Sequence, residues 1–307
     1  RYSTDQEWLV PHFEKMLYDQ ASLTLAYLDA WQATGEKEYE LVVRETLDYV
    51  MADLSDDQGG FHSAEDADSE GEEGKFYVFT KTEIQHWLDE KQAAALIAAF
   101  GVTDEGNFEH DTNILNLAPG HDRKSRSELL SAAMQRVLAE RNKRIRPHLD
   151  DKVLADWNGL MIGAMARAGR MLGEPKYVQR AARAAGFVLD TMRTDNGALM
   201  HRWRGGKAGI PGFLEDYAYM ISGLIELYQA DHDPRWLRAA TELQTHQDHL
   251  FATPDGKDYY RTDGEDQTVL RRSGEPMDNV RPAGRSVAAM NLLRLGDLML
   301  DETMHKR

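Results

Sequence analysis

The sequence predicts an all-α toroid built from repeated two-helix hairpins. Two kinds of turn recur, the first at Gly35, Gly173 and His232 and the second at Gly59, Gly197 and Gly256. Each second turn follows its first turn by 24 positions (59 minus 35, 197 minus 173, 256 minus 232). The first turns are spaced by 138 (173 minus 35) and by 59 (232 minus 173). A fixed register at two landmarks indicates a repeat near 59 residues long, with an insertion after the first unit.

Apolar residues at three- and four-residue steps predict helices on both sides of the first turns. The first helix of each pair is predicted over 12–34, 153–172 and 213–231, and its partner over 37–54, 175–193 and 234–251. Pro175 and Pro234 fall in first-turn positions, where a missing N–H costs nothing. A seventh helix begins near Pro282 and runs through Leu300. The first helix of each pair is apolar all round, which favours a closed ring of inner and outer helices over an open solenoid.

The insertion contains an acidic loop and two more predicted helices, over 81–100 and 126–146. Aromatic and β-branched residues predict a strand over 76–80. The acidic loop over 65–73 fails as an EF-hand, because Tyr77 stands where a bidentate Glu is required. We interpret the loop as a solvated or substrate-facing hairpin tip, with another kind of cation site as the alternative, and predict no metal ligands.

Composition excludes several classes of function. The formal net charge of -16 is a poor match for nucleic acid or anionic lipid. The chain has no cysteine, which excludes disulfides and thiolate sites and suits the cytoplasm. No apolar run is long enough for a membrane span. No Pro-, Gly- or Ser-rich linker divides the 307 residues, so we expect one domain over 1–307, and a start at Arg1 rather than Met suggests part of a longer protein.

The long loops over 55–152, 194–212 and 252–282 each lead from an outer helix into the next inner helix, so they share one face of the ring. The candidate catalytic residues on this face are His12, Glu14, Asp19, Asp151 and Asp216. The candidate substrate-binding residues are Tyr18, Glu65, Asp66, Lys152, Trp157, Asn158, Glu215 and Tyr217. Four further polar residues precede the last helix, namely Glu275, Asp278, Asn279 and Arg281.

Acids mixed with aromatic residues and His are typical of sugar sites, where rings stack on sugar faces and carboxylates bind hydroxyls or move protons. Each feature also has a structural interpretation. Acids at helix starts serve as caps and dipole partners. Trp157 and Tyr217 could be core residues, and His12 a buried, hydrogen-bonded histidine. No phosphate-binding loop, zinc-protease motif or hydrolase elbow is present.

Several long motifs resemble the family that includes spermatogenesis-associated protein 20 and its bacterial relatives. They are WLVPHFEKMLYDQ at 8–20, SAEDADSEGEEGKFY at 63–77 and PGFLEDYA at 211–218, with shorter matches at 1–5, 146–148, 150–152, 157–159 and 286–289. The resemblance implies an (α/α)6 barrel like that of six-hairpin glycosidases and of N-acylglucosamine and cellobiose 2-epimerases, incomplete in these residues. It also implies a thioredoxin-like domain ahead of Arg1.

We therefore expect a carbohydrate-processing or sugar-binding barrel that takes a small saccharide and needs no cofactor. In an epimerase, His12 or His148 would exchange the proton next to a ring-opened carbonyl. In a hydrolase, two carboxylates would flank the glycosidic bond, drawn from Glu14, Asp19, Asp151 and Asp216. The alternatives are a non-catalytic module that recruits a client or glycan for the thioredoxin-like domain, and a structural toroid with a vestigial site.

Overall fold

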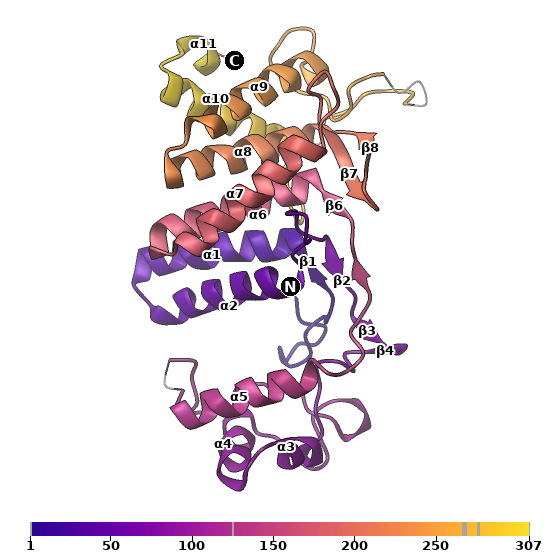
Figure 1. The fold of residues 1–307 in the computed structure, drawn as a ribbon, viewed down its shortest axis with the longest axis vertical. Helices are drawn as coiled ribbons and strands as arrows, with labels where there is room; N and C mark the ends of the chain where they lie inside the picture. Colours follow the sequence, from indigo (N-terminus) through magenta and orange to yellow (C-terminus); the bar gives the residue numbers. More distant parts are fainter. Residues whose placement is uncertain (1, 125, 266–268, 275–276, 307) are drawn as a thin grey trace. The chain divides into compact units, whose positions relative to one another are not determined.

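The computed structural model describes residues 2–124, 126–265, 269–274 and 277–306 (Figure 1). The chain forms two compact units. Unit 1 comprises Arg1–Lys15 and Ala64–Asp150, and unit 2 comprises Met16–Ser63 and Asp151–Arg307. The single domain expected over 1–307 stays a prediction.

Unit 2 contains three helical hairpins in the predicted register. They are α1 (Leu17–Thr34) with α2 (Lys37–Asp53), α6 (Ala155–Leu172) with α7 (Pro175–Thr191), and α8 (Leu214–Asp231) with α9 (Pro234–Phe251). Helix α6 begins 138 positions after α1 (155 minus 17), and α8 begins 59 positions after α6 (214 minus 155). The repeat predicted from the turns is thereby confirmed.

The inner helices of unit 2 lie side by side (Figure 1). Helix α6 packs between α1 and α8, and α10 (Gly284–Met299) packs on α8 before the short α11 (Glu302–His305). Each partner helix covers its own inner helix. Twelve of the 18 residues are buried in each of α6 and α8, as expected for inner helices. Gly159 allows the close approach of α6 and α8, because a Cβ there would lie 2.5 Å from the backbone nitrogen of Met220.

The first turns end the inner helices in the left-handed conformation. Gly35, Gly173 and His232 are the C-caps of α1, α6 and α8, with φ of 70°, 66° and 59°. Glycine adopts this conformation without a Cβ penalty, and a non-glycine residue adopts it less readily. His232 therefore keeps the turn geometry of the repeat at some conformational cost.

A small sheet lies at the N-terminal end of α6 (Figure 1). Its strands are β6 (Val153–Leu154), β7 (Met200–Arg204) and β8 (Lys207–Pro211), paired antiparallel in that order. Leu154 pairs with Arg202, and Met200 pairs with Pro211. Because β6 runs directly into α6, the register of this sheet fixes which β7 side chains reach the start of the helix.

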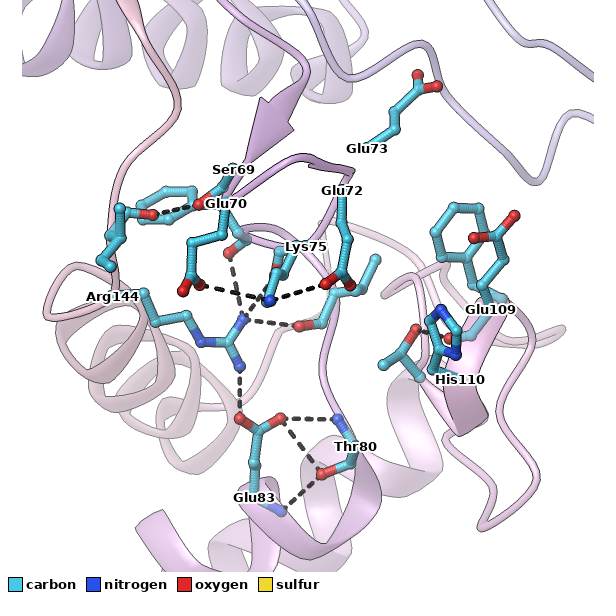
Figure 2. Close-up of a pocket in the computed structure, with 15 residues that line it drawn as sticks. Ser69, Glu70, Glu72, Glu73, Lys75, Thr80, Glu83, Glu109, His110 and Arg144 are labelled. Atoms are coloured by element: carbon cyan, nitrogen blue, oxygen red, sulfur yellow. Dashed lines mark hydrogen bonds and ion pairs between the residues drawn. The ribbon is translucent and has the colours of Figure 1, made fainter.

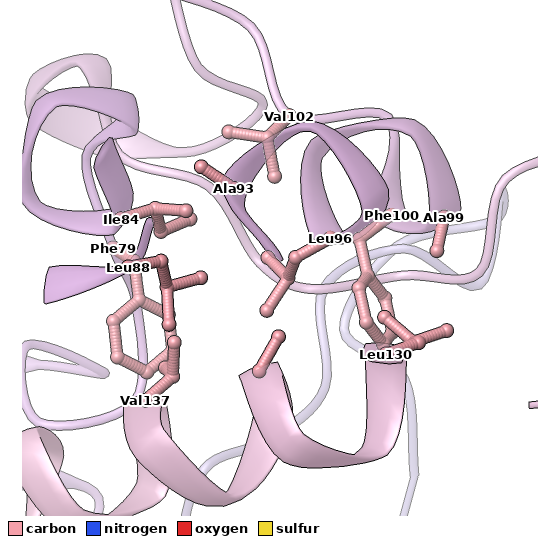
Figure 3. Close-up of a cluster of buried hydrophobic side chains, with 11 residues drawn as sticks. Phe79, Ile84, Leu88, Ala93, Leu96, Ala99, Phe100, Val102, Leu130 and Val137 are labelled. Atoms are coloured by element: carbon pink, nitrogen blue, oxygen red, sulfur yellow. The ribbon is translucent and has the colours of Figure 1, made fainter. Parts of the chain in front are cut away.

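Unit 1 contains three α-helices, one 3-10 turn and several two-residue strands in its described residues. The helices are α3 (Lys81–Trp87), α4 (Glu90–Phe100), the 3-10 turn η1 (Glu109–Asp111) and α5 (Glu128–Arg141). Strand β2 (Ala64–Glu65) pairs with β5 (Leu149–Asp150), and β3 (Asp68–Ser69) pairs with β4 (Glu72–Glu73). Strand β1 (Lys15–Met16) precedes α1. Figure 3 shows the core between α3, α4 and α5, in which Ile84 and Leu96 are fully buried.

Four predicted elements require correction. The helix predicted over 12–34 begins at Leu17, and that over 126–146 covers only Glu128–Arg141. The helix predicted over 81–100 is broken at Leu88, after which the Asp89 side chain accepts the Gln92 N–H and starts α4. The strand predicted over 76–80 is wrong. Residues 74–77 form a turn, because Gly74 at φ 75° lets its carbonyl accept the Tyr77 N–H at 2.8 Å.

Within the described ranges, every helix is too short or too polar to cross a membrane.

Candidate functional site

Two acidic residues lie in the first turns of the neighbouring inner helices α6 and α8. Asp156 is 3% exposed and Asp216 is fully buried. The Oδ2 of Asp216 accepts the backbone N–H of Phe213, just before α8, at 2.7 Å. The Oδ1 of Asp156 accepts the backbone N–H of Trp157 at 2.8 Å. Helix N-termini, with their free N–H groups and positive dipole ends, therefore hold both carboxylates in the interior of unit 2.

His201 joins these carboxylates from strand β7. Its Nδ1 lies 3.0 and 3.1 Å from the two oxygens of Asp216, and its side chain is 23% exposed. The Oδ1 of Asp216 also accepts the backbone N–H of Asp156 at 3.0 Å. Because a carboxylate accepts hydrogen bonds, this contact assigns the proton to Nδ1 and leaves Nε2 as the acceptor of the neutral ring.

Two groups in this cluster have pKa values above their ordinary ones. Burial opposes the charged form of His201, but the hydrogen bond and charge of Asp216 raise the pKa of the imidazole above its ordinary value. Burial, followed by the charge of Asp216, raises the pKa of Asp156 to about 6 against the opposing charge of Arg281. Perturbed acid and base groups side by side are typical of sites that move protons.

Arg281 reaches the cluster from the segment before α10. Its guanidinium forms an ion pair with the Oδ2 of Asp156. It lies 5.9 to 6.0 Å from the ring centres of Tyr18, Trp157 and Tyr219. Tyr18 and Trp157 meet edge to face with ring centres 4.8 Å apart. The segment therefore places a cation among three aromatic rings and beside an acid.

A third carboxylate, Glu215, is 3% exposed and lies 3.4 Å from the Nε of Arg261. Glu215 and Arg261 join the four charged residues already described. The cluster then contains three carboxylates (Asp156, Glu215, Asp216), two guanidinium groups (Arg261, Arg281) and one imidazole (His201). Their formal charges cancel when the imidazole is protonated. Among these charges, those of Asp216 and Asp156 favour the protonated imidazole of His201, and that of Arg281 opposes it.

The cluster also offers atoms that could hold a metal ion. Ligand atoms of Asp156, His201 and Asp216 lie within 4.8 Å of one another. However, one oxygen of Asp156 faces Arg281, and Nδ1 of His201 faces Asp216. A metal would have to displace the guanidinium or break the His–Asp hydrogen bond. The geometry therefore fits proton transfer better than metal binding.

Four of the predicted site residues lie in or beside this cluster, namely Tyr18, Trp157, Glu215 and Asp216. Asp151 is exposed and pairs with Arg204 at 2.5 Å. Asp19, in the first turn of α1, and Lys152 are half-buried in the same unit. Glu275 lies outside the described residues.

Two predicted substrate-binding residues hold the fold together. The side chain of Asn158 accepts the Phe61 N–H at 2.8 Å and donates to the Phe61 and Leu154 carbonyls at 3.0 and 2.9 Å. The buried Tyr217 hydroxyl accepts the Leu199 N–H at 2.8 Å. These contacts give both side chains a structural role, and substrate binding by Asn158 and Tyr217 stays a prediction.

Four predicted residues belong to unit 1. The Nδ1 of His12 accepts the backbone N–H of Glu14 at 3.2 Å. Glu65 is 2% exposed and accepts the Tyr77 hydroxyl at 2.7 Å and the Arg146 guanidinium at 2.7 and 3.1 Å. Asp66 accepts the following backbone N–H at 2.7 Å. Convergence of these four with the unit 2 residues on one surface stays a prediction.

Sequence reasoning missed His201 and Asp156. Asp156 had a usable signal, because it stands 59 positions before Glu215 (215 minus 156) and therefore occupies the same place in the repeat. His201 had only its position in the long loop over 194–212, since its contact with Asp216 depends on the register of β7.

No known protein-family profile matches the chain. Among curated proteins, human spermatogenesis-associated protein 20 is 37% identical over 96% of this chain and 43% of its own length. The rat protein of the same name is 36% identical over 97% of this chain and 43% of its own length. The chain thus spans less than half the length of these relatives.

Two solved structures share the fold. A sugar epimerase from a ruminal bacterium has a TM-score of 0.58 at 12% identity, covering 96% of this chain and 58% of its own. Cellobiose 2-epimerase from Bacillus thermoamylovorans has a TM-score of 0.57 at 8% identity, covering 98% and 60%. The predicted (α/α)6 type of fold is confirmed by these neighbours, and identities this low support the fold alone.

Proposed function

Because this chain belongs to the spermatogenesis-associated protein 20 family and shares the fold of sugar epimerases, we propose that unit 2 processes a saccharide by proton transfer at His201. The observation that carries the proposal is the buried cluster of Asp156, His201 and Asp216 beside Arg281. A saccharide ligand, an upstream thioredoxin-like domain and a cytoplasmic location remain proposals of the same kind.

His201 has the orientation that a general base requires. Asp216 holds Nδ1, so the lone pair of the neutral ring lies on Nε2. Among the described residues, Nε2 has no hydrogen-bond partner. A buried carboxylate behind an imidazole fixes its tautomer and stabilises the imidazolium that forms when the ring takes a proton. His201 can therefore accept a proton at Nε2 and return it.

A ring-opened sugar supplies a suitable proton, on the carbon beside its carbonyl. Nε2 would take this proton, the electron pair of the C–H bond would form the enediolate, and Arg281 would stabilise the negative oxygen. The imidazolium would then return the proton. Return to the neighbouring carbon, with the hydroxyl proton of O2 passing to O1, isomerises the sugar, whereas epimerisation requires a donor on the opposite face. Tyr18 and Trp157 would supply ring surface for the sugar.

Hydrolysis of a glycosidic bond fits this cluster less well. It requires one carboxyl group at the leaving oxygen and a second at the anomeric carbon or its water. Both oxygens of Asp216 accept backbone N–H groups and face His201. Those of Asp156 are held by Trp157 and Arg281. Asp216 therefore orients His201, and Asp156 balances the charge of Arg281. His201 is the group that remains able to react.

Deuterium uptake tests the proposal. Wild-type protein is incubated in D2O with glucose, mannose or cellobiose, and the carbon-bound deuterium is measured by NMR. We expect His201→Gln to lower the exchange rate about 10²- to 10⁴-fold, the usual contribution of a general base. His249→Gln, which changes an exposed histidine on α9, is the matched control. No exchange with any of the three sugars, or equal exchange in His201→Gln, would contradict the proposal.

The rival hypothesis, a non-catalytic module that recruits a client for a thioredoxin-like domain, makes the opposite forecast. It expects no deuterium uptake and retention of client binding in His201→Gln. Client capture by a fusion of a thioredoxin-like domain to this chain, measured for the wild type and for His201→Gln, would separate the two functions.

A further inference from the structure

Unit 1 contains a pocket of about 430 Å³ that the proton-transfer cluster does not use. The β3–β4 hairpin, the segment around η1 and the stretch at Arg144–Ile145 enclose it (Figure 2). Its lining is mainly apolar and includes Phe76, Val78 and Phe108. A cavity of this size with an apolar floor can hold a side chain or a small ligand.

The rim of the pocket has an excess of negative charge. Five glutamates line it against two permanent cations, Lys75 and Arg144, which leaves three net negative charges (five minus two) with His110 neutral. Lys75 is already held by Glu72 at 3.0 Å and by Glu70 at 3.5 Å. Both cations of the pocket therefore have internal partners, and neither compensates the remaining acids.

The other cation of the pocket, Arg144, has both an ion-pair partner and a backbone hydrogen-bond partner. Its guanidinium lies 2.8 Å from Glu83 and donates to the Val78 carbonyl at 2.8 Å (Figure 2). By contrast, the carboxylates of Glu73 and Glu109 are exposed and form no ion pair with any described residue. In Figure 2 neither carboxylate is joined to a neighbour. Two acids on the rim are thus left to meet a cation from outside.

The geometry points to a peptide ligand: we propose that this pocket binds a lysine or arginine side chain of a basic peptide segment. The aliphatic stem would lie on Phe108 and Ile145, and the charged head would meet Glu73 and Glu109. Lysine and arginine bury their stems on apolar surface while the charge stays at the edge. Aromatic rings add attraction for the cationic group.

The protein's own Lys75 illustrates the chemistry. Its ammonium lies between two carboxylates on the same rim, and Lys75 is itself one of the residues that line the pocket. A bare metal ion would gain nothing from an apolar floor, because hard cations take oxygen ligands. A ligand with both a stem and a charge makes use of both parts of the lining. This inference does not depend on the proposed function of unit 2.

A titration with a labelled peptide tests the inference. The probe is a fluorescein-labelled hexapeptide with alternating arginine and leucine, added to the whole chain and followed by fluorescence anisotropy. The double variant Glu73→Gln with Glu109→Gln should weaken binding about 3- to 10-fold, as expected for two exposed ion pairs. The control, Glu7→Gln with Glu105→Gln, removes two exposed acids of the same unit outside the pocket and should stay within about twofold.

A second variant tests the apolar floor. Ile145 lines the pocket and is 64% exposed as a residue, so Ile145→Ala should leave folding intact and weaken binding about 2- to 5-fold. Equal losses in the pocket double variant and its control would show attraction by net charge alone and overturn the inference. So would binding of spermine as tight as that of the peptide with no effect of Ile145→Ala, because a free polyamine would then explain the charge.

Discussion

Asp216→Asn is the substitution that most directly examines the cluster in unit 2. The carboxylate accepts backbone N–H groups at 3.0 and 2.7 Å and contacts His201 through both oxygens. An asparagine keeps one oxygen but replaces the other with an NH2 group, which can only donate. Whichever way the amide is turned, at least one buried donor loses its acceptor.

The expected loss of stability follows from these contacts. An unsatisfied buried donor costs about 1–3 kcal/mol, and a hydrogen bond to a charged group contributes about 1.5–3 kcal/mol. We therefore expect Asp216→Asn to lower the free energy of unfolding by about 2–4 kcal/mol. Folding should survive, because small domains have about 5–15 kcal/mol of stability.

Urea unfolding at pH 7 measures this loss, and NMR titration of the imidazole measures the pKa of His201. The titration should move to lower pH, because Asp216 raises that pKa through its hydrogen bond and charge. Asp151→Asn is the control, since it removes an exposed acid paired with Arg204 and should change stability by less than about 1 kcal/mol. An unfolding midpoint and a His201 pKa that both match the wild type would refute the assigned role of Asp216.

Three further predictions concern the same unit. Gly159→Ala should lower the free energy of unfolding by about 1–3 kcal/mol, because the added Cβ would press on Met220, and an unchanged urea midpoint would rule out the close approach of α6 and α8. Asn158→Ala should cost about 2–4 kcal/mol by leaving the Phe61 backbone groups without partners, and faster amide exchange at Phe61 would report it. The pKa of Asp156 is raised from 3.8 to about 6, so stability that is present below pH 4 should fall by about 3 kcal/mol as the pH rises to about 6. Asp156→Asn should remove that part of the pH dependence. A plot of unfolding free energy against pH that runs parallel to the wild type would exclude the raised pKa of Asp156.

Much of the fold was predictable because its signals are local. The helices of unit 2 follow from apolar periodicity, and their ends follow from turns that need the left-handed conformation. The error over 76–80 has a local cause as well. Aromatic residues there favour a strand, but Gly74 closes a turn and directs the rings into the core of unit 1. The turn that Gly74 permits therefore outweighed the strand propensity of the aromatic residues.

The candidate site was predictable only in part. Tyr18, Trp157, Glu215 and Asp216 stand at helix starts, where the repeat itself points to them. His201 has no such marker, because a histidine in a hairpin becomes part of the cluster only through strand register. Its partner Asp216 follows 15 positions later (216 minus 201), across the β7–β8 turn.

The repeat explains why a site forms at these helix starts. The same position in the three hairpins is held by Tyr18, Asp156 and Glu215, at spacings of 138 (156 minus 18) and 59 (215 minus 156). Since inner helices pack side by side, equivalent first-turn residues come close together whatever their chemistry. Their N-terminal dipoles favour acids there, and burial raises the pKa of Asp156. The scaffold thus gathers acids. The base His201, from strand β7, and the cation Arg281, from the segment before α10, convert the acids into a candidate site for moving protons.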